Sequence, residues 1–307
     1  MASNLTVIMV NYDQKKEILE CLASLGKSTY KPQQIIISDN GSSDGSIELI
    51  RKEFPTTTVI LNNANIGYAE ANNRAFGVVD IGDNEYLLLL NSDTVVTSSF
   101  LENLIVAAER TSFDIVGPKI MYYDRPNIIW FAGGYFNPDR GTYYHRGKGE
   151  IDKGQYNEKV FCDFVTGCAL LIRKSLFRKL GGYDPKFFMY CEDLDLCLRA
   201  RAIGARIGYV SDAQLYHKVK DQSSYDAIPL ARYYYARNML YVVKHSKCRV
   251  DKRLSYTKSV LYSIKGNLKL VILRPAVGLS GLCGILDFLL SKKGRCRRSF
   301  EFVFTRH

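Results

Sequence analysis

The sequence predicts an α/β fold in which a mostly parallel, Rossmann-like sheet is flanked by helices. Short apolar, β-branched segments alternate with helical patterns through the first hundred residues. The apolar segments are continuous, as expected for strands that are buried on both faces. Hydrophobic residues make up 47% of the chain and charged residues 24%, which is enough apolar material for a packed core. These features predict a parallel sheet with helices on both sides.

Strands and helices follow one another in a regular order. We expect four strands, at residues 5–10, 33–38, 57–61 and 86–90. A helix is expected after each strand. The first helix carries the apolar stripe Ile18, Leu19, Leu22 and Leu25 and ends at Gly26. The second begins near Ile47 and stops at Pro55, and the other two span residues 67–79 and 98–110. In such sheets, ligands bind beyond the carboxyl ends of the strands.

Polar residues follow every one of the four strands. In chain order they are Asn11 and Tyr12; Asp39, Asn40 and Gly41; Asn65, Gly67 and Asn72; and Asn91, Ser92 and Asp93. One polar turn is ordinary loop chemistry, but four at one sheet edge indicate a ligand site. The first strand is followed by NYDQKK instead of G-x-G-x-x-G, and no G-x-x-x-x-G-K-[ST] motif occurs, so a dinucleotide site and a P-loop are not expected.

The positive charge is concentrated toward the C-terminal end. Residues 230–307 contain 17 Lys and Arg against 3 Asp and Glu, whereas residues 1–229 contain 25 against 28. The basic segment predicts an anionic partner, and a membrane surface is favoured over nucleic acid because no nucleic-acid-binding module is recognisable. Its uninterrupted apolar stretch, residues 276–286, is shorter than the ~20 residues needed to cross a bilayer. The eight scattered cysteines fit reduced cytoplasmic thiols, and no secretory signal is recognised.

Several motifs resemble glycosyltransferase family 2. They are VIMVNY at 7–12, DNGSSDGS at 39–46, NIGYAEANN at 65–73, NSD at 91–93, TGCALLIRK at 166–174, GGYDPKFFMYCEDLDLCLRARAIG at 181–204 and LYH at 215–217. The resemblance covers about residues 5–220, is nearest to the rhamnosyltransferase-like branch and implies the GT-A fold. It further implies inverting transfer of a sugar, with rhamnose as the first expectation. The donor is expected to be dTDP- or UDP-linked, and the acceptor a saccharide or lipid-linked molecule of cell-surface polysaccharide synthesis.

The resemblance also implies roles for single residues at the sheet edge. Asp39 takes the place of a carboxylate that binds the donor nucleobase. Asp93 stands at the position of the metal-binding carboxylate in a D-x-D motif, and the first position of that motif is Asn91 in this chain. His217 stands where relatives have a histidine that contacts the metal or the diphosphate, and a purely structural histidine is the alternative. Mg²⁺ or Mn²⁺ held by Asp93 and His217 would offset the charge of the departing diphosphate.

The Glu192-Asp193 pair is the expected source of the catalytic base. Inverting transfer needs a carboxylate that takes the proton of the attacking acceptor hydroxyl. The resemblance implies this pair, and we favour Asp193 over Glu192. The alternative is that these acids open a helix and favour its dipole, which is the interpretation preferred for Asp195. Thr166 and Gly167, which precede an apolar strand, are expected to line the acceptor pocket.

The predicted organisation has two parts. Residues 1–227 form the catalytic domain, with a nucleotide-sugar half at 1–110 and an acceptor and base half at 111–227. Residues 228–307 form a basic helical extension, which either lies on the inner face of a cell membrane or packs against the catalytic domain. Two other functions stay open at this point. One is a nucleotide-sugar-binding relative without turnover, and the other is a membrane-surface or nucleic-acid-binding protein that uses the α/β domain as a scaffold.

Overall fold

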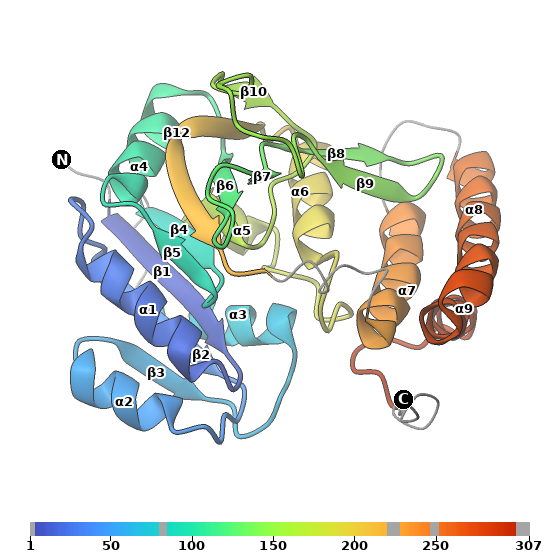
Figure 1. Cartoon of the computed structure of the whole chain (residues 1–307), viewed down its shortest axis with the longest axis horizontal. Helices are drawn as coiled ribbons and strands as arrows, with labels where there is room; N and C mark the ends of the chain where they lie inside the picture. Colours follow the sequence, from blue (N-terminus) through green and yellow to red (C-terminus); the bar gives the residue numbers. More distant parts are fainter. Residues whose placement is uncertain (1–3, 80–84, 220–227, 246–251, 299–307) are drawn as a thin grey trace.

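A mixed sheet forms the centre of the molecule (Figure 1). The computed structural model describes residues 4–79, 85–219, 228–245 and 252–298. Within these residues the sheet has the strand order β10-β12-β6-β11-β4-β1-β2-β3, with β5 added beside β12 and β7 beside β6. β8 and β9 form a separate antiparallel hairpin.

The N-terminal half contributes the parallel part of the sheet. Its strands are β1 (Asn4–Asn11), β2 (Gln34–Asp39), β3 (Thr58–Leu61) and β4 (Glu85–Leu90), and its helices are α1 (Lys15–Gly26), α2 (Ser46–Glu53), α3 (Tyr68–Phe76) and α4 (Phe100–Arg110). β1 pairs in parallel with β2 and β4, and β2 pairs in parallel with β3. β1 is buried almost throughout, as its continuous apolar run predicted.

In the second half of the chain, which follows β4, the strands no longer all run in the same direction. The strands of this half are β5 (Thr94–Val96), β6 (Ile115–Tyr122), β7 (Ile129–Phe131), β8 (Gly134–Asn137), β9 (Thr142–His145), β10 (Val160–Phe161), β11 (Ala169–Arg173) and β12 (Ile207–His217). β11 runs antiparallel to both β4 and β6, whereas β12 runs parallel to β6. β5 pairs with β12 so that Thr94 lies opposite His217, which brings the end of β12 beside the residues that follow β4.

The C-terminal extension is a packed group of helices beside the second half of the sheet (Figure 1). It consists of α7 (Pro229–His245), α8 (Lys252–Leu273) and α9 (Pro275–Leu289). Glycines let α9 approach its neighbours closely. A Cβ at Gly278 would lie 2.2 Å from the backbone nitrogen of Val271 in α8, and one at Gly284 would lie 2.4 Å from the carbonyl oxygen of Tyr233 in α7. A side chain larger than hydrogen at either position would force the helices apart.

The structure confirms the α/β class, the mostly parallel sheet and the helical extension. The third helix ends at Phe76, three residues earlier than expected. α5 (Lys174–Lys179) and α6 (Glu192–Ala202) complete the second half. In the part of the chain that the structure describes, none of the helices has the length and apolar character needed to cross a membrane. The expected domain boundary at 227/228 touches residues 220–227, which lie outside the described residues, so the division stays a prediction.

Candidate active site

Asp39 organises the turn at the end of β2. Its side chain is 2% exposed, and its carboxylate accepts hydrogen bonds from the backbone N–H groups of Gly41 and Ser42, each at 3.0 Å. It also accepts a bond of 2.9 Å from the Asn11 amide at the end of β1. Because these bonds join two adjacent strand ends, Asp39 shapes the turn that the sequence assigned to the nucleobase. Direct contact of its carboxylate with a nucleobase stays a prediction.

Asparagine side chains lie between the end of β2 and the start of α3. Asn40 Nδ2 donates to the carbonyl of Gly67 at 3.3 Å, and Asn65 Oδ1 accepts from the Gly67 N–H at 3.0 Å. Asn72 is buried, and its Oδ1 has no hydrogen-bond partner among the residues that the structure describes. The same is true of Asn11 Oδ1. Buried acceptors are ordinarily paired, so these two oxygens fit a ligand that donates hydrogen bonds here.

The start of α3 touches the loop that leads to the Glu192-Asp193 pair. The Tyr68 N–H donates to the carbonyl of Phe188 at 2.7 Å. Gly67 has a φ of +89°, and a Cβ there would lie 2.4 Å from the Phe188 carbonyl oxygen. Glycine is therefore required at this position for two reasons: other residues rarely adopt this φ, and there is no space for a Cβ atom. This contact joins the N-terminal half of the chain to the loop before the expected base.

Asp93 and His217 meet at the other end of the edge. Asp93 Oδ1 lies 3.2 Å from His217 Nε2, and no other group of the described residues hydrogen-bonds to this buried oxygen. The Trp130 ring meets the His217 ring edge-on, with the ring centroids 4.6 Å apart. Burial alone would raise the pKa of Asp93, but the adjacent His217 lowers the pKa of this carboxyl below its usual range. Asp93 is thus ionised, as a cation ligand must be.

The Asp93 and His217 pair fits a divalent cation that is completed by the substrate. A carboxylate oxygen and an imidazole nitrogen are suitable ligands for Mn²⁺, and the otherwise unpaired Asp93 oxygen fits a cation beside it. Across the described ranges, no three His, Cys, Asp or Glu side chains are grouped so that they could hold a metal ion. A cation at this pair would need further ligands, such as the oxygens of a diphosphate and water, as is common for Mg²⁺ sites that serve phosphates.

Residues 166–168 connect the two ends of the site. The Gly167 N–H donates to Asp193 Oδ2 at 2.8 Å, and the Gly167 carbonyl accepts from the Tyr68 hydroxyl at 2.9 Å. The Cys168 carbonyl accepts from the Asn91 N–H at 2.9 Å, and the Cys168 thiol lies close to the His217 side chain. One short segment before β11 thus contacts the expected base on one side and the expected metal site on the other.

Glu192 and Asp193 open α6 in different environments. Asp193 is partly exposed, and its carboxylate accepts from the N–H groups of Gly167 and Leu194, whereas Glu192 is buried. Glu192 Oε2 has no hydrogen-bond partner within the described part of the chain. Burial raises the pKa of Asp193, and burial together with the charge of Asp193 raises the pKa of Glu192 well above its ordinary value. Asp193 is therefore the member of the pair that ionises first.

The structure also places the remaining residues that the sequence singled out. Asp195 forms an ion pair of 2.7 Å with Arg199, in the first turn of α6, which agrees with its structural interpretation. Ser92 hydrogen-bonds to Gln14, and Thr166 bonds to Asp193. Tyr12 is largely exposed at the strand edge. None of these contacts by itself tests binding of a donor or an acceptor.

Sequence reasoning missed the contacts of two residues that the structure brings to the centre. Tyr68, in α3, donates from its hydroxyl to the Gly167 carbonyl. Cys168 lies close to His217, and burial together with the charges of Asp93 and Asp193 raises the pKa of its thiol. Both stand inside motifs that were recognised, NIGYAEANN and TGCALLIRK, but the contact of Tyr68 joins residues that are 99 positions apart. No local spacing or periodicity could have identified them.

Comparison with known proteins gives consistent matches. The model of "Glycosyl transferase family 2" matches residues 6–181. N-acetylglucosaminyl-diphospho-decaprenol L-rhamnosyltransferase of Mycobacterium tuberculosis is 26% identical over 266 residues, which cover 80% of this chain and 86% of that protein. Rhamnosyltransferase WbbL of Escherichia coli K12 is 26% identical, with 66% of this chain and 79% of that protein covered.

Among solved structures, the mannosyltransferase PcManGT of Pyrobaculum calidifontis in complex with GDP-Man and Mn²⁺ superposes with a TM-score of 0.60 at 14% identity, over 95% of this chain and 89% of that one. At this identity the likeness concerns the fold alone. It extends over nearly the whole chain, including the helices that follow β12.

Proposed function

The chain belongs to glycosyl transferase family 2, and we propose that it is an inverting rhamnosyltransferase that acts on a lipid-linked saccharide acceptor. Glycosyl transfer from a nucleotide sugar on a GT-A fold is the established part of this statement. The sugar, the nucleobase, the acceptor and the metal are our proposals.

One arrangement carries the proposal. Residues 166–168 contact Asp193 through Gly167 and His217 through Cys168, and His217 lies 3.2 Å from Asp93. This arrangement supports binding of the donor diphosphate at Asp93 and of the acceptor at Asp193, with the anomeric carbon between them. A scaffold without turnover would have no need to hold a partly exposed, ionised Asp193 in this position.

The chemistry follows from these positions. The acceptor hydroxyl oxygen attacks the anomeric carbon of the donor sugar, and Asp193 takes the hydroxyl proton. A new C–O glycosidic bond forms while the C–O bond to the diphosphate breaks on the opposite face, so the configuration inverts. The nucleoside diphosphate leaves with the bonding electrons. Asp193 returns its proton to solvent, which its partial exposure permits.

Asp93 and His217 would hold a Mg²⁺ or Mn²⁺ ion, which supplies Lewis-acid stabilisation of the departing diphosphate. Ionised Asp93 would contribute negative charge in that role. Although burial opposes it, the neighbouring Cys168 and Asp93 raise the pKa of His217 well above its usual range, so a cation would displace the His217 proton before the nitrogen could act as a neutral ligand. Trp130 packs edge-on against the His217 ring and limits its rotation. The superposed mannosyltransferase was solved in complex with Mn²⁺, which supports this assignment.

The relatives favour rhamnose and a lipid-linked acceptor. The mycobacterial relative is named for L-rhamnose transfer to N-acetylglucosaminyl-diphospho-decaprenol, and the alignment spans most of both chains. In the present chain, Tyr190 lies close to Glu192 and Asp93, and it is our candidate for a wall of the acceptor side. Burial, followed by the charges of Glu192 and Asp93, raises the pKa of Tyr190 to about 12, so this ring stays neutral beside both acids.

We further propose that α8 meets an anionic membrane surface on the cytoplasmic side. Leu261, Leu268 and Ile272 are exposed at spacings of seven and four residues, and Ile272 is 83% exposed. Lys258, Lys265 and Lys269 are exposed on the same side of the helix. Within residues 252–290 the sequence contains a single acidic residue, Asp287, which is buried. An apolar stripe flanked by cations is the pattern of a helix that lies in a membrane interface.

A transfer assay tests the proposed function. The purified chain is incubated with Mn²⁺, a polyprenyl-diphosphate-linked N-acetylglucosamine acceptor, and dTDP-rhamnose or one of several UDP- and GDP-linked sugars. Asp193→Asn should lower kcat by roughly 10²- to 10⁴-fold, the range for loss of a general base. Donor binding, followed by calorimetry, should be unchanged. Asp195→Asn is the matched control in the same helix turn. Normal transfer by Asp193→Asn would exclude Asp193 as the base.

A further inference from the structure

The backbone just before the Glu192-Asp193 pair adopts an unfavourable conformation. Tyr190 has a φ of 66° and Cys191 a φ of 71°, so two consecutive residues with side chains are left-handed. Each such residue is disfavoured, and the conformation persists only where surrounding contacts fix it. The turn at 190–191 sets the direction in which α6 starts, and therefore where the first two side chains of α6 point.

The contacts that fix this turn come from the C-terminal extension. Asn238 in α7 donates from Nδ2 to the carbonyls of Met189 and Tyr190, each at 2.9 Å. The amide has two N–H groups, and both are used on the two peptide units that enter the turn. Asn238 is fully buried, so water does not replace these bonds readily.

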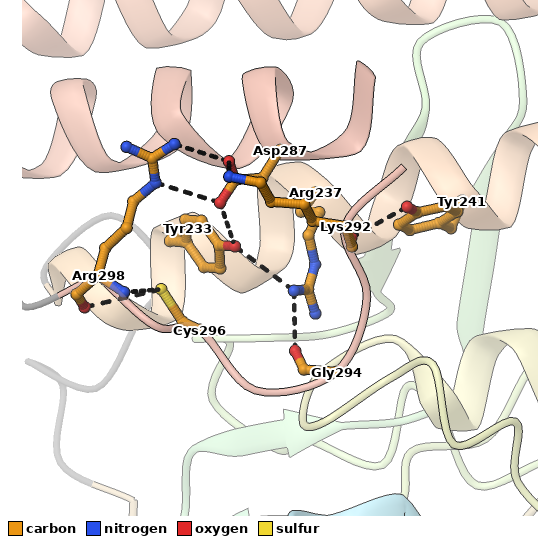
Figure 2. A network of polar contacts seen from close by, with 8 residues as sticks. All are labelled: Tyr233, Arg237, Tyr241, Asp287, Lys292, Gly294, Cys296 and Arg298. Carbon is orange, nitrogen blue, oxygen red and sulfur yellow. Dashed lines mark hydrogen bonds and ion pairs between the residues drawn. The ribbon is translucent and has the colours of Figure 1, made fainter. Parts of the chain in front are cut away.

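Arg237 fixes the orientation of that amide. Its Nε donates to Asn238 Oδ1 at 3.0 Å, which turns Nδ2 toward the loop. Arg237 is itself fully buried, with its guanidinium over the Tyr234 ring at 5.0 Å and its Nη1 bonded to the Gly294 carbonyl at 2.8 Å. Figure 2 shows the guanidinium lying between the Tyr233 hydroxyl and Gly294.

The segment after α9 closes this arrangement. The Gly294 N–H donates to the Lys186 carbonyl at 3.0 Å, and the Cys296 N–H donates to the Tyr234 hydroxyl at 2.7 Å. Tyr234 in turn stacks on Phe188, with the ring centroids 5.5 Å apart and the planes at 16°. Residues 186–190 are thus held by α7 and by the segment after α9 on one side. On the other side, the Phe188 carbonyl accepts from Tyr68 of the nucleotide-sugar half.

We infer that Asn238 is a positioning residue for sugar transfer: it holds the left-handed turn at Tyr190 and Cys191, and thereby the placement of Asp193. The inference rests on the proposed role of Asp193 as the base. It makes the C-terminal extension a part of the catalytic site, because the amide that fixes the turn belongs to α7. Arg237 acts through Asn238 by holding its side-chain oxygen.

The test compares Asn238→Ala with a matched control. Asn267 in α8 is also fully buried, and its side chain bonds to Arg232 and to the Ser263 carbonyl, away from the turn. Asn238→Ala should lower kcat by about 10²-fold, the cost of displacing a catalytic group by about 1 Å, while the donor KM stays unchanged. Asn267→Ala should lower the melting temperature to a similar degree and leave kcat within about twofold.

A second substitution separates strain from general destabilisation. Cys191→Gly removes the penalty for positive φ, so in the Asn238→Ala background it should restore part of the lost kcat. Cys191→Ala removes the same thiol but keeps the Cβ, and it should restore nothing. If Asn238→Ala alone does not fold, Asn238→Ser, which keeps a single donor, takes its place in the same comparison.

The outcomes are distinguishable from those of the proposed function. Wild-type kcat in Asn238→Ala, with Asp193→Asn inactive, would overturn the positioning role and leave the base assignment intact. Equal losses of kcat in Asn238→Ala and Asn267→Ala would also overturn it, since stability alone would then explain the effect. Normal transfer by Asp193→Asn would instead exclude Asp193 as the base, on which the positioning role rests, and would leave glycosyl transfer itself intact.

Discussion

The backbone N–H of Gly167 donates a hydrogen bond of 2.8 Å to the carboxylate of Asp193. A charge-assisted bond of this kind favours the ionised form and fixes the direction of the carboxylate. The same short segment contacts His217 through Cys168, so the proposed donor end and the proposed acceptor end of the site both contact residues 167–168, next to β11. This relationship is the basis of the predictions on the site.

The first prediction concerns the metal. Asp93→Ala should lower kcat/KM by about 10²- to 10³-fold, as for loss of one group that stabilises charge in the transition state. The stabilisation of the chain by a nucleoside diphosphate with Mn²⁺, measured as a shift in melting temperature, should disappear as well. His217→Ala should lower kcat/KM and reduce the shift in melting temperature. Trp130→Phe, which keeps an aromatic ring beside His217, is the control. A thermal shift by Mn²⁺ that survives Asp93→Ala contradicts the assignment.

The second prediction concerns the acid limb of the pH–rate profile. Asp193 must be ionised to accept a proton, and burial raises its pKa above the ordinary value of about 3.9. The rate should therefore fall with decreasing pH at a midpoint above that value. Profiles of kcat/KM for the wild type and for Glu192→Gln should both show one acid limb, because Glu192 keeps its proton while Asp193 ionises. An acid limb at or below the ordinary value would show that the base is another group.

The third prediction concerns stability. The folded chain raises the pKa of Glu192, so the folded state binds more protons than the unfolded state above the ordinary Glu pKa. Stability contributed by this residue is therefore lost as pH rises from that value toward the raised one. Glu192→Gln should increase the free energy of unfolding, and the gain should grow over this pH range. Urea denaturation at several pH values measures it. A gain that does not depend on pH would contradict the explanation.

The fourth prediction concerns the packing of α9. Gly284→Ala places a methyl group 2.4 Å from the Tyr233 carbonyl oxygen, so α9 must move away from α7. Overpacking of this kind typically costs about 1–3 kcal/mol. The free energy of unfolding should fall by that amount in urea denaturation. Gly266→Ala in α8 is the control, because its nearest neighbour is the end of the Arg232 side chain at 3.9 Å. It should be neutral or stabilising.

The fifth prediction concerns the membrane. The chain should sediment with vesicles that contain phosphatidylglycerol and much less with neutral vesicles, and binding should weaken as salt increases. Ile272→Glu and Lys269→Glu should each reduce binding. Leu61→Glu, at an exposed leucine of β3, is the control. Removal of everything after residue 245 is a poorer test, because α9 packs on α7. Unchanged sedimentation of both variants would exclude this face of α8.

Much of the fold follows from local sequence patterns. The first four strands begin and end within two residues of the expected positions, because each is a continuous apolar run bounded by turn residues. The first helix ends at Gly26 and the second just before Pro55, as their terminal residues predicted. The antiparallel direction of β11 was not predicted, since a short apolar strand has the same composition in either direction.

The site was predicted in part. Asp93 and His217 were expected to meet, and they do, although 124 positions separate them. That expectation came from the family motif and not from spacing. Arg237-Asn238 resembles a pair that family members often have in such a helix, but the resemblance implied no role for Asn238. Its contacts with Met189 and Tyr190 depend on how α7 packs against the second half of the sheet, which no pattern in α7 reveals. The left-handed turn at 190–191 contains no glycine that would have marked it.

The contact between Gly67 and Phe188 restricts how parts of this enzyme can be exchanged with relatives. A hybrid that takes residues 1–110 from an enzyme with another donor brings a foreign residue 67 against the native loop at 188. Any residue other than glycine there would collide with the Phe188 carbonyl oxygen, 2.4 Å from its Cβ. On its other side that loop is held by α7, through the Asn238 hydrogen bonds and the stacking of Tyr234 on Phe188, and these contacts oppose its displacement. Donor specificity can therefore be transplanted only together with a glycine at this junction.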